Sequence, residues 1–438
     1  MTGAPADAAG GTLEAMTDPG AAAGLAPAAA MPATDSATEA AVAPPLSIVP
    51  SWVVYGFQFI AIGAWTAFAA NYFKAMGLDV AIIGVLAAVP SAVAIVASPL
   101  WGLAADRLGD MRPPYLVAAL LAAGAAVALA GAPAMPGLAI AVIVLSVGAA
   151  GLGPLLDART IQRLWPRRER FGQARVAGSI AFMVGTIGTG VVIAGTELRA
   201  LFVVYAVAMV GAGVAAVALL GRPGRAKRVG SVGPLAALGL LRLPGLGLFF
   251  LGSCVMWVSA VGSMALFSLR VVELGGDTQL VGLGWATSAL FEVPVMVLFS
   301  RLARRVGVGP LIFAGSLLFI LRAAAWTLAA SPASLIAFTS LGGIGYALAM
   351  VGTTSYIASR VPPHFQATAQ ALFGSTTFAF GSIAGAILAG QVAAIGGLWA
   401  VYPAGGVVAA VGAMLIGAAL RQGRPGAAAT GAAGSPGR

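Results

Sequence analysis

The stretch LVGLGWATSALFEVPVMVLFSRLARRVGVGPLIFAGSLLFILRAAAWTLAA, residues 280–330, decides the fold. It holds an apolar segment with Glu292 near its middle, a basic turn at residues 300–305, and a second apolar segment with Arg322. Each segment approaches the roughly 20 residues that a helix needs to cross a bilayer. A charge at the bilayer centre costs about 2.5–3.5 kcal/mol and is retained where it is paired or functional. The stretch therefore predicts a transmembrane hairpin at the functional centre of the protein.

The composition extends this interpretation to the whole chain. Of the 438 residues, 60% are hydrophobic and only 9% are charged, whereas soluble domains carry about 25% charged residues. Twelve apolar segments follow one another along the chain. Their expected spans are 50–73, 81–104, 113–132, 137–158, 172–195, 200–220, 246–269, 280–302, 309–330, 333–357, 366–391 and 398–420.

Each of these segments is expected to be a helix, because lipid leaves no partner for an unpaired backbone N–H or C=O group. A β-barrel is disfavoured, since its strands would alternate polar and apolar residues and these segments do not. The fold class is thus an all-α membrane protein with twelve transmembrane helices. Pro90, Pro99 and Pro294 are expected to bend or locally unwind their helices.

An internal repeat divides the twelve helices into two sets. Residues 105–109, ADRLG, match residues 303–307, ARRVG, and five residues of helix five recur in helix eleven. The recurring residues Gly178, Ser179, Phe182, Gly185 and Ile187 match Gly374, Ser375, Phe378, Gly381 and Ile383. Two parallel six-helix repeats are expected, an arrangement in which the substrate site lies at mid-membrane between the halves.

The expected domains follow from these repeats. Residues 47–220 form the N-terminal six-helix bundle, 221–245 a basic cytoplasmic linker, and 246–421 the C-terminal bundle. Residues 1–46 and 422–438 are rich in Ala, Gly and Pro, which favours disordered tails. A mis-assigned start codon, with Met16 or Met31 as the true start, is the alternative for the first tail.

The basic residues predict the orientation. Loops and ends on the side of both termini hold 20 of the 24 Lys and Arg residues, and the opposite loops hold Lys74, Arg199 and Arg270. Because positive residues collect in the cytoplasm, both termini are expected there. The excess of Arg over Lys and the many Ala and Gly residues indicate a GC-rich bacterial genome, and hence the bacterial inner (plasma) membrane.

Several function classes are disfavoured by what the chain lacks. It has one cysteine, one histidine and no Gly-x-x-x-x-Gly-Lys-Ser/Thr loop, so a zinc cluster, an enzyme with many titratable groups and ATP-driven transport are not expected. No cofactor is expected. The net charge of +10 does not indicate nucleic-acid binding, because the basic residues lie in short loops between apolar segments. Basic residues in such loops set the orientation of a membrane protein. The GAAGLG sequence at 148–153 lies inside a predicted membrane helix, which excludes a dinucleotide site.

The sequence GLAADRLG at residues 102–109 resembles the loop signature of the major facilitator superfamily. PLLDA at 154–158, FGQARVAGS at 171–179 and FEVP at 291–294 resemble a subgroup that contains the 3-phenylpropionate permease and is related to lactose permease. The resemblance implies secondary transport. Two departures stand out: Asp110 and Met111 replace basic residues of the loop signature, and residues 333–357 lack the His and carboxylate of lactose permease.

Glu292 is the expected carrier of the coupling proton. When ionised it is expected to pair with Arg322, and when protonated to free Arg322 for an anionic substrate. A permanent structural ion pair that locks two helices is the alternative. Asp157 and Arg175, at the cytoplasmic ends of helices four and five, are expected to form a gate with Asp106 and Arg107. The alternative for Asp157 and Arg175 is a solvated ion pair that contributes little to stability. The alternative for Arg107 is that it only helps to set the orientation of the protein in the membrane.

The substrate pocket is expected to draw on Arg322 and on polar and aromatic residues of the helices, for each of which simple packing is the alternative. These residues are Gln58, Trp65, Trp257, Trp285, Tyr346, Thr353 and Tyr356. Aromatic rings beside one buried arginine favour an aromatic or other organic carboxylate, carried by proton symport with alternating access. Proton-antiport efflux of drugs or metabolites is the alternative, and a non-transporting sensor is a further one. The expected partners are a small-molecule substrate, protons and the lipid bilayer, for a monomer without nucleic acid.

Overall fold

Twelve membrane-length helical segments make up residues 47–131, 134–164, 171–221, 239–362 and 365–422, the residues that this computed structural model describes. The predicted tail at 1–46, residues 423–438 of the second tail and residues 222–238 of the linker lie outside them. The described part is helical and contains no strand, which confirms the all-α fold. The first six segments are α2 (Val49–Ala75), α3 (Val80–Leu108), α4 (Arg112–Ala130), α5 (Met135–Arg163), α6 (Phe171–Ala194) and α7 (Ala200–Leu219).

The other six segments include two that are interrupted. The single helices are α11 (Thr278–Val306), α12 (Val308–Thr327), α13 (Pro332–Arg360) and α16 (Val401–Gln422), the last preceded by the 3-10 turn η7 (Leu398–Ala400). The seventh segment consists of α9 (Leu246–Ala265) and α10 (Phe267–Glu273), and the eleventh of α14 (Gln366–Phe373), η6 (Gly374–Phe380) and α15 (Gly381–Gly396). The turn η4 (Leu240–Arg242) precedes α9.

Polar residues at the helix ends satisfy backbone groups that lack a partner inside the helix. The Asp79 side chain accepts a hydrogen bond from the Ala81 backbone N–H at the start of α3, and Asp277 accepts one from Leu280 at the start of α11. Gly109 ends α3 with a φ of 63°, a conformation that favours glycine. These caps explain why long apolar runs begin and end where they do.

The prolines and the interruptions do not coincide. Pro90 and Pro99 lie inside the continuous helix α3 and Pro294 inside α11, so none of them unwinds its helix, and the bend that was the other expectation stays a prediction. The chain instead breaks at Leu266, between α9 and α10, and widens into a π-helix at η6. In lipid, the backbone groups that proline frees can be satisfied by neighbouring helices, so proline need not break a membrane helix.

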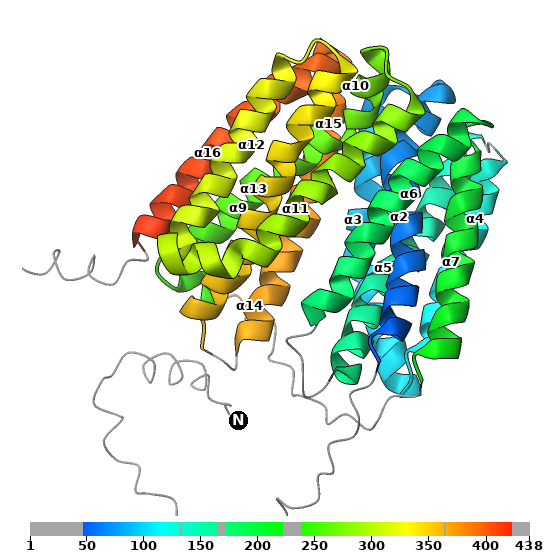
Figure 1. Ribbon diagram of the computed structural model, residues 1–438, viewed down its shortest axis with the longest axis horizontal. Coiled ribbons are helices and arrows are strands. Elements are labelled where there is room, and N and C mark those ends of the chain that lie inside the picture. Colours follow the sequence, from blue (N-terminus) through cyan, green and yellow to red (C-terminus); the bar gives the residue numbers. More distant parts are fainter. Residues whose placement is uncertain (1–46, 132–133, 165–170, 222–238, 363–364, 423–438) are drawn as a thin grey trace, which may run out of the picture. The chain divides into compact units, whose positions relative to one another are not determined.

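The helices form two groups within the unit that begins at Ser47. In the first group α2 packs against α6 and α7, and α5 packs against α3 and α4. In the second group α13 packs against α11 and α12, and α9 against α15 and α16. The two groups meet mainly where α3 contacts α15 and where α6 contacts α11 (Figure 1). The domain boundaries at residues 220 and 246 stay a prediction.

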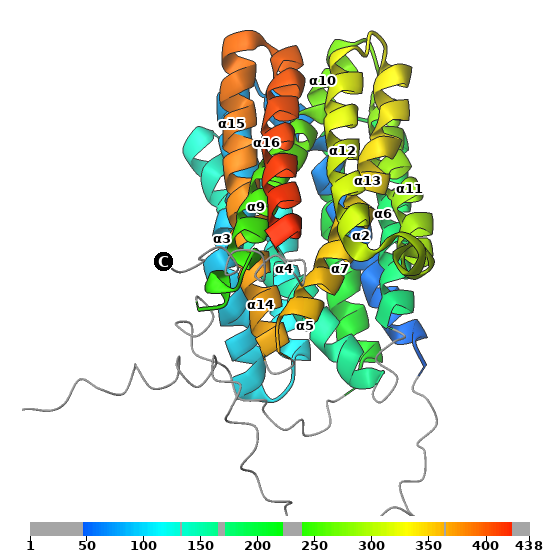
Figure 2. The same cartoon turned by 90° about the vertical axis from the view of Figure 1, so that its left-hand side faces the viewer.

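Small residues bring the two groups together at one end. A Cβ atom on Gly84 of α3 would lie 2.6 Å from the carbonyl oxygen of Ala386 in α15. The Thr278 hydroxyl of α11 donates a 3.1 Å hydrogen bond to the carbonyl of Gly190 in α6. This end contains the starts of α3 and α11 and lies near α10, opposite α14 (Figure 2). It is the end whose loops carry few basic residues.

Candidate functional site

Arg175 of α6 lies at the centre of a polar cluster that faces the second helix group. Its Nη1 atom is 3.5 Å from Oδ1 of Asp157 in α5, and the Tyr55 hydroxyl of α2 donates a 2.5 Å hydrogen bond to the same oxygen. The guanidinium group lies 5.1 Å from the ring centre of Phe59 and 5.8 Å from that of Tyr55. The side chains of Arg175 and Asp157 are 44% and 36% exposed, so a solute can reach both. The pairing expected from sequence is therefore present, while its gating role stays a prediction.

Glu292 approaches this cluster from the other helix group. It lies half-buried on α11, and Arg175 is the charged residue that acts electrostatically on it. Both residues also act on Tyr346 of α13. Arg175 thus forms an ion pair with Asp157 of the first group and acts electrostatically on Glu292 of the second.

Aromatic rings from both groups lie along the same two helices. The ring centres of Phe182 in α6 and Trp285 in α11 are 6.3 Å apart at an interplanar angle of 70°. The Trp285 indole nitrogen donates a 3.1 Å hydrogen bond to the Ser268 hydroxyl, which fixes the ring plane. The predicted pocket residue Trp285 is therefore at the contact between the two groups.

Two other predicted pocket residues lie inside the first group. Gln58 is 3% exposed and accepts a 2.9 Å hydrogen bond from the Tyr115 hydroxyl. Trp65 packs against Phe73, Phe202 and Tyr205 at ring distances of 6.0–6.5 Å. Both side chains already have partners in the protein, and their predicted contact with substrate stays a prediction.

The second group contains a cavity of about 40 Å³. Predicted pocket residues Trp257, Tyr346 and Thr353 line it, together with Phe319, Phe373, Phe378 and the hydroxyl residues Ser253, Ser316 and Thr377. The Trp257 indole nitrogen donates a 2.9 Å hydrogen bond to Ser382. Tyr356 does not line this cavity; its ring packs 4.5 Å from that of Phe249. Three of the predicted pocket residues thus line this cavity, and the contact of Tyr356 with substrate stays a prediction.

Arg322 does not pair with Glu292 in this structure, which corrects the sequence-based expectation. At 1.5 Å per residue both lie about 21 Å from the turn between α11 and α12, but α13 packs against both helices and separates them. Among the described residues neither forms an ion pair. Arg322 is 4% exposed, with its guanidinium carbon 4.5 Å from the ring centre of Trp326 and 5.1 Å from that of Phe319.

Glycine explains how α13 fits between its neighbours. A Cβ atom on Gly342 would lie 2.7 Å from Nη1 of Arg322, and one on Gly343 would overlap the carbonyl oxygen of Ser288 in α11. Adjacent glycines thus let α12 approach one face of α13 and α11 the other. The two charges face different sides of one helix.

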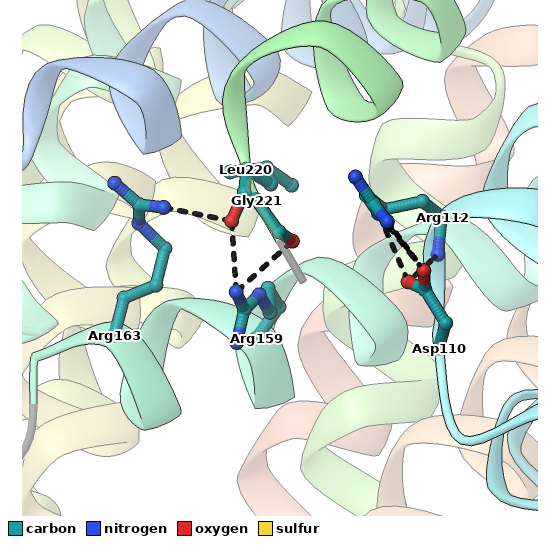
Figure 3. A network of polar contacts seen from close by, with 6 residues as sticks. All are labelled: Asp110, Arg112, Arg159, Arg163, Leu220 and Gly221. Carbon is teal, nitrogen blue, oxygen red and sulfur yellow. Dashed lines mark hydrogen bonds and ion pairs between the residues drawn. The ribbon is translucent and has the colours of Figure 1, made fainter. Parts of the chain in front are cut away.

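The loop between α3 and α4 has its own ion pair. Nε and Nη2 of Arg112 donate to the Asp110 carboxylate at 3.0 and 2.7 Å (Figure 3). Hydrogen bonding from Arg112 holds the pKa of Asp110 below its usual value. Asp106 and Arg107 are exposed, and no ion pair involves either of them among the described residues. Their predicted gating role stays a prediction.

The chain matches the family described as MFS_1 like family over residues 51–403. This chain belongs to the MFS_1 like family. It is 26% identical to the maltose permease of Geobacillus stearothermophilus over 326 residues, which are 73% of this chain and 81% of the permease. It is 32% identical to a putative sugar efflux transporter of Deinococcus radiodurans over 327 residues, 70% of this chain and 79% of that protein.

The fold is similar to that of solved transporters. The nucleoside transporter NupG superposes with a TM-score of 0.75 and 17% identity, covering 86% of this chain and 99% of NupG. As an MFS_1 like protein the chain is a multi-pass membrane transporter for a small-molecule substrate and not an enzyme. Its likeness to the 3-phenylpropionate permease subgroup stays a prediction.

Three aromatic residues near the cluster of this MFS_1 like protein, Tyr55, Phe59 and Phe182, are not among the site residues predicted from the sequence. Tyr55 and Phe59 are four residues apart on α2 and share one helix face, and Arg175 contacts both. The sequence could have indicated this pair, because an aromatic residue in a membrane helix is a candidate partner for a cation at similar depth.

Arginines of α5 hold the end of α7 in this MFS_1 like protein (Figure 3). Nη2 of Arg159 donates to the carbonyls of Leu220 and Gly221 at 2.8 and 3.0 Å, and Nη1 of Arg163 donates to that of Leu220 at 2.7 Å. A helix C-terminus carries partial negative charge and unpaired carbonyls, so cations stabilise it. This contact fixes the point at which the linker begins.

Replacing Arg159 with methionine should lower the free energy of unfolding by about 1.5–3 kcal/mol, the usual contribution of hydrogen bonds to a charged group. Thermal melting of the purified protein in detergent measures the change. Arg107→Met, which alters an exposed arginine at the end of α3, is the control and should change stability by no more than about 0.5 kcal/mol. Equal melting temperatures for the two variants would contradict the assigned role.

Proposed function

We propose that this protein transports a sugar or a similar uncharged, polyhydroxylated ring compound, bound between the two helix groups at Asp157, Arg175 and Glu292. The observation that carries the proposal is the exposed ion pair of Arg175 and Asp157, on a helix, α6, that packs against the helix of Glu292, α11, in the other group. Sugar hydroxyls both donate and accept, and their hydrogen bonds to charged groups are roughly twice as strong as neutral ones. A ligand that touches all three side chains links the two groups.

The aromatic rings support the same class of substrate. Phe59 and Tyr55 lie beside Arg175, and Phe182 and Trp285 lie along the same helices. Binding sites for small molecules combine such apolar walls with a few polar groups that fix the orientation. The names of two relatives, a maltose permease and a putative sugar efflux transporter, agree with a sugar substrate.

The organic carboxylate expected from sequence has less support. Arg175 already has Asp157 as a partner, and the cluster contains two carboxylates for one arginine. Arg322 does not line the cavity and packs against two aromatic rings instead. An anionic substrate would therefore meet net negative charge when both carboxylates are ionised.

Proton coupling by Glu292 remains part of the proposal. Glu292 is half-buried in a membrane helix, where an ionisable side chain is costly and is by default a candidate for function. When Glu292 is protonated, Asp157 is the one ionised carboxylate of the cluster that attracts Arg175. When Glu292 is deprotonated, its charge also attracts Arg175, toward the second group. The two carboxylates thus offer Arg175 alternative partners on the two sides of the substrate site.

The proposed direction of access follows from the orientation. With both termini in the cytoplasm of a bacterium, the end closed by Gly84 and Thr278 faces outward, so the substrate site opens inward. The protein is proposed to work as a monomer by alternating access, as a symporter. Proton-antiport efflux is the alternative, and the relative named as a putative sugar efflux transporter favours it.

The test is uptake into proteoliposomes under an imposed pH gradient, with labelled sugars, nucleosides and aromatic acids compared at equal concentration. Accumulation of a sugar supports the proposal, and efflux against the same gradient would replace symport with antiport. Accumulation of an aromatic acid in the absence of sugar transport would restore the carboxylate interpretation. No transport of any of these compounds overturns the proposed substrate class.

Glu292→Gln should abolish accumulation while impairing exchange of internal for external sugar much less. Glutamine has nearly the shape of a protonated glutamate, with one acceptor oxygen and an NH2 donor in place of the hydroxyl, but it does not take up or release a proton. Accumulation should fall to simple equilibration, a loss of about tenfold for each 1.4 kcal/mol of proton gradient. Full accumulation by the Glu292→Gln variant would remove Glu292 from proton transfer.

A further inference from the structure

The cavity inside the second helix group is separate from the proposed sugar site. It is bounded by α9, α12, α13, α14, η6 and α16, and its volume of about 40 Å³ exceeds the roughly 10–15 Å³ that one water requires. Five aromatic rings and several aliphatic side chains form most of its wall. The polar groups on it are hydroxyls, and none of the lining residues is charged.

Thr377 contributes a buried hydroxyl without a partner to this wall. It is 2% exposed, lies in the π-helix η6, and its hydroxyl oxygen has no hydrogen-bond partner among the described residues. The neighbouring hydroxyls of Ser375 and Thr376 donate to the carbonyls of Ala371 and Leu372 at 3.0 and 2.8 Å. Leaving a buried polar group unsatisfied costs about 1–3 kcal/mol, so such a group indicates a water or another partner.

Tyr346 connects this cavity to Glu292. It lines the cavity, and its ring is 5.8 Å from that of Trp257. Gly343 of α13 packs against the carbonyl oxygen of Ser288 in α11. Tyr346 lies three residues beyond Gly343 and Glu292 four residues beyond Ser288, so the two side chains leave adjacent turns of these parallel helices. Thr353 lines the same cavity seven residues further along α13, about 10 Å toward Arg360. The hydroxyls of Tyr346, Thr353 and Thr377 therefore lead from the proposed proton carrier toward the end of the bundle that contains α14.

We propose that this cavity holds water and that Tyr346, Thr377 and Thr353 relay the coupling proton between Glu292 and the α14 end of the protein, an inference that rests on the proposed function. The Glu292 carboxyl gives its proton to the Tyr346 oxygen as the Tyr346 hydroxyl proton passes to water. Each later oxygen accepts one proton and releases its own. One proton moves overall, and every hydroxyl regains its starting form.

The π-helix suits this relay. A π-helix inserts one extra residue per turn and is frequent at functional sites. In η6 it leaves Thr377 on the cavity wall while Ser375 and Thr376 bond to their own helix. Thr377 thus has a free hydroxyl at the point where the cavity needs one.

The decisive variant is Thr377→Val, which removes the hydroxyl at nearly constant shape, with Thr376→Val on the same π-helix as the matched control. Proteoliposomes loaded with a pH-sensitive dye report sugar exchange, sugar accumulation and sugar-linked proton uptake. In Thr377→Val, proton-driven accumulation and proton uptake should fall by about tenfold or more, since a positioned proton-transfer group contributes about 10²–10⁴-fold. Sugar exchange by Thr377→Val should stay within about twofold of the wild-type rate, since exchange needs no net proton movement. The control Thr376→Val should keep wild-type exchange, accumulation and proton uptake.

Wild-type accumulation and proton uptake in Thr377→Val would overturn the inference. If exchange also falls in Thr377→Val, Thr377→Ser decides, because it restores the hydroxyl without the methyl group. Recovery of accumulation by Thr377→Ser supports the relay, and recovery of exchange alone overturns it. Absence of sugar uptake or of proton movement in the wild-type protein would instead be a failure of the proposed function.

Discussion

Replacing Arg175 with glutamine is expected to lower the initial rate of sugar uptake by about a hundredfold. Hydrogen bonds to a charged group contribute about 1.5–3 kcal/mol, and each 1.4 kcal/mol changes an equilibrium tenfold. The variant loses the ion pair between Arg175 and Asp157 and removes the positive charge that acts on Glu292. Uptake of labelled sugar into proteoliposomes, with binding measured separately by calorimetry, gives both the rate and the affinity.

Two controls accompany the Arg175 variant. Arg304→Gln removes an exposed arginine from the last turn of α11 and should leave uptake unchanged. Arg175→Lys keeps the charge but loses the planar guanidinium and its paired donors, so an intermediate rate is expected. Uptake by Arg175→Gln at the wild-type rate would show that the sugar does not bind at this cluster.

Replacing Gly282 with leucine is expected to keep the protein from closing at the end where the two groups touch. A Cβ atom at Gly282 of α11 would overlap the carbonyl oxygen of Thr186 in α6, and backbone atoms cannot move aside as a flexible side chain can. Overpacking costs about 1–3 kcal/mol, which would lower the equilibrium ratio of closed to open protein by about 5- to 140-fold, at 1.4 kcal/mol for each factor of ten. Uptake should fall accordingly, because a transporter that cannot close one end cannot complete its cycle.

A thiol-labelling experiment measures this opening directly. In a Cys254→Ser background, a cysteine in place of Thr186, which is fully buried at the contact, should react faster with a membrane-impermeant reagent when Gly282→Leu is present. Gly124→Leu is the control, because a side chain at that position of α4 meets open space. Unchanged labelling together with normal uptake in Gly282→Leu would contradict the role assigned to this contact.

Much of the fold could be predicted from the sequence because the bilayer removes most alternatives. A backbone in lipid must bond to itself, so apolar runs of the right length become helices. The predicted spans agree with α2 to α16 to within about a turn at most ends, and the pair Asp157 and Arg175 followed from their depth alone. Depth along the membrane is readable from sequence, since it depends only on residue count.

The rotation of each helix and the identity of its neighbours could not be read in this way. Glu292 and Arg322 lie at equal depth on consecutive helices, yet α13, which follows both in the sequence, packs between them. A membrane helix is apolar on all sides, because lipid is as apolar as a protein core. Its sequence therefore does not show which face packs against other helices. The π-helix at Gly374 was equally hidden, as it contains no proline.

The glycine pair Gly342 and Gly343 has a consequence for protein engineering. Substitutions at either position would push α13 away from Arg322 or from Ser288, so these two sites tolerate little sequence drift. Phe59 and Phe182 are partly exposed beside the proposed substrate site, whereas Tyr55 is fully buried and hydrogen-bonded to Asp157. Libraries that seek a new sugar specificity should therefore randomise Phe59 and Phe182 and keep Tyr55 and the glycine pair fixed.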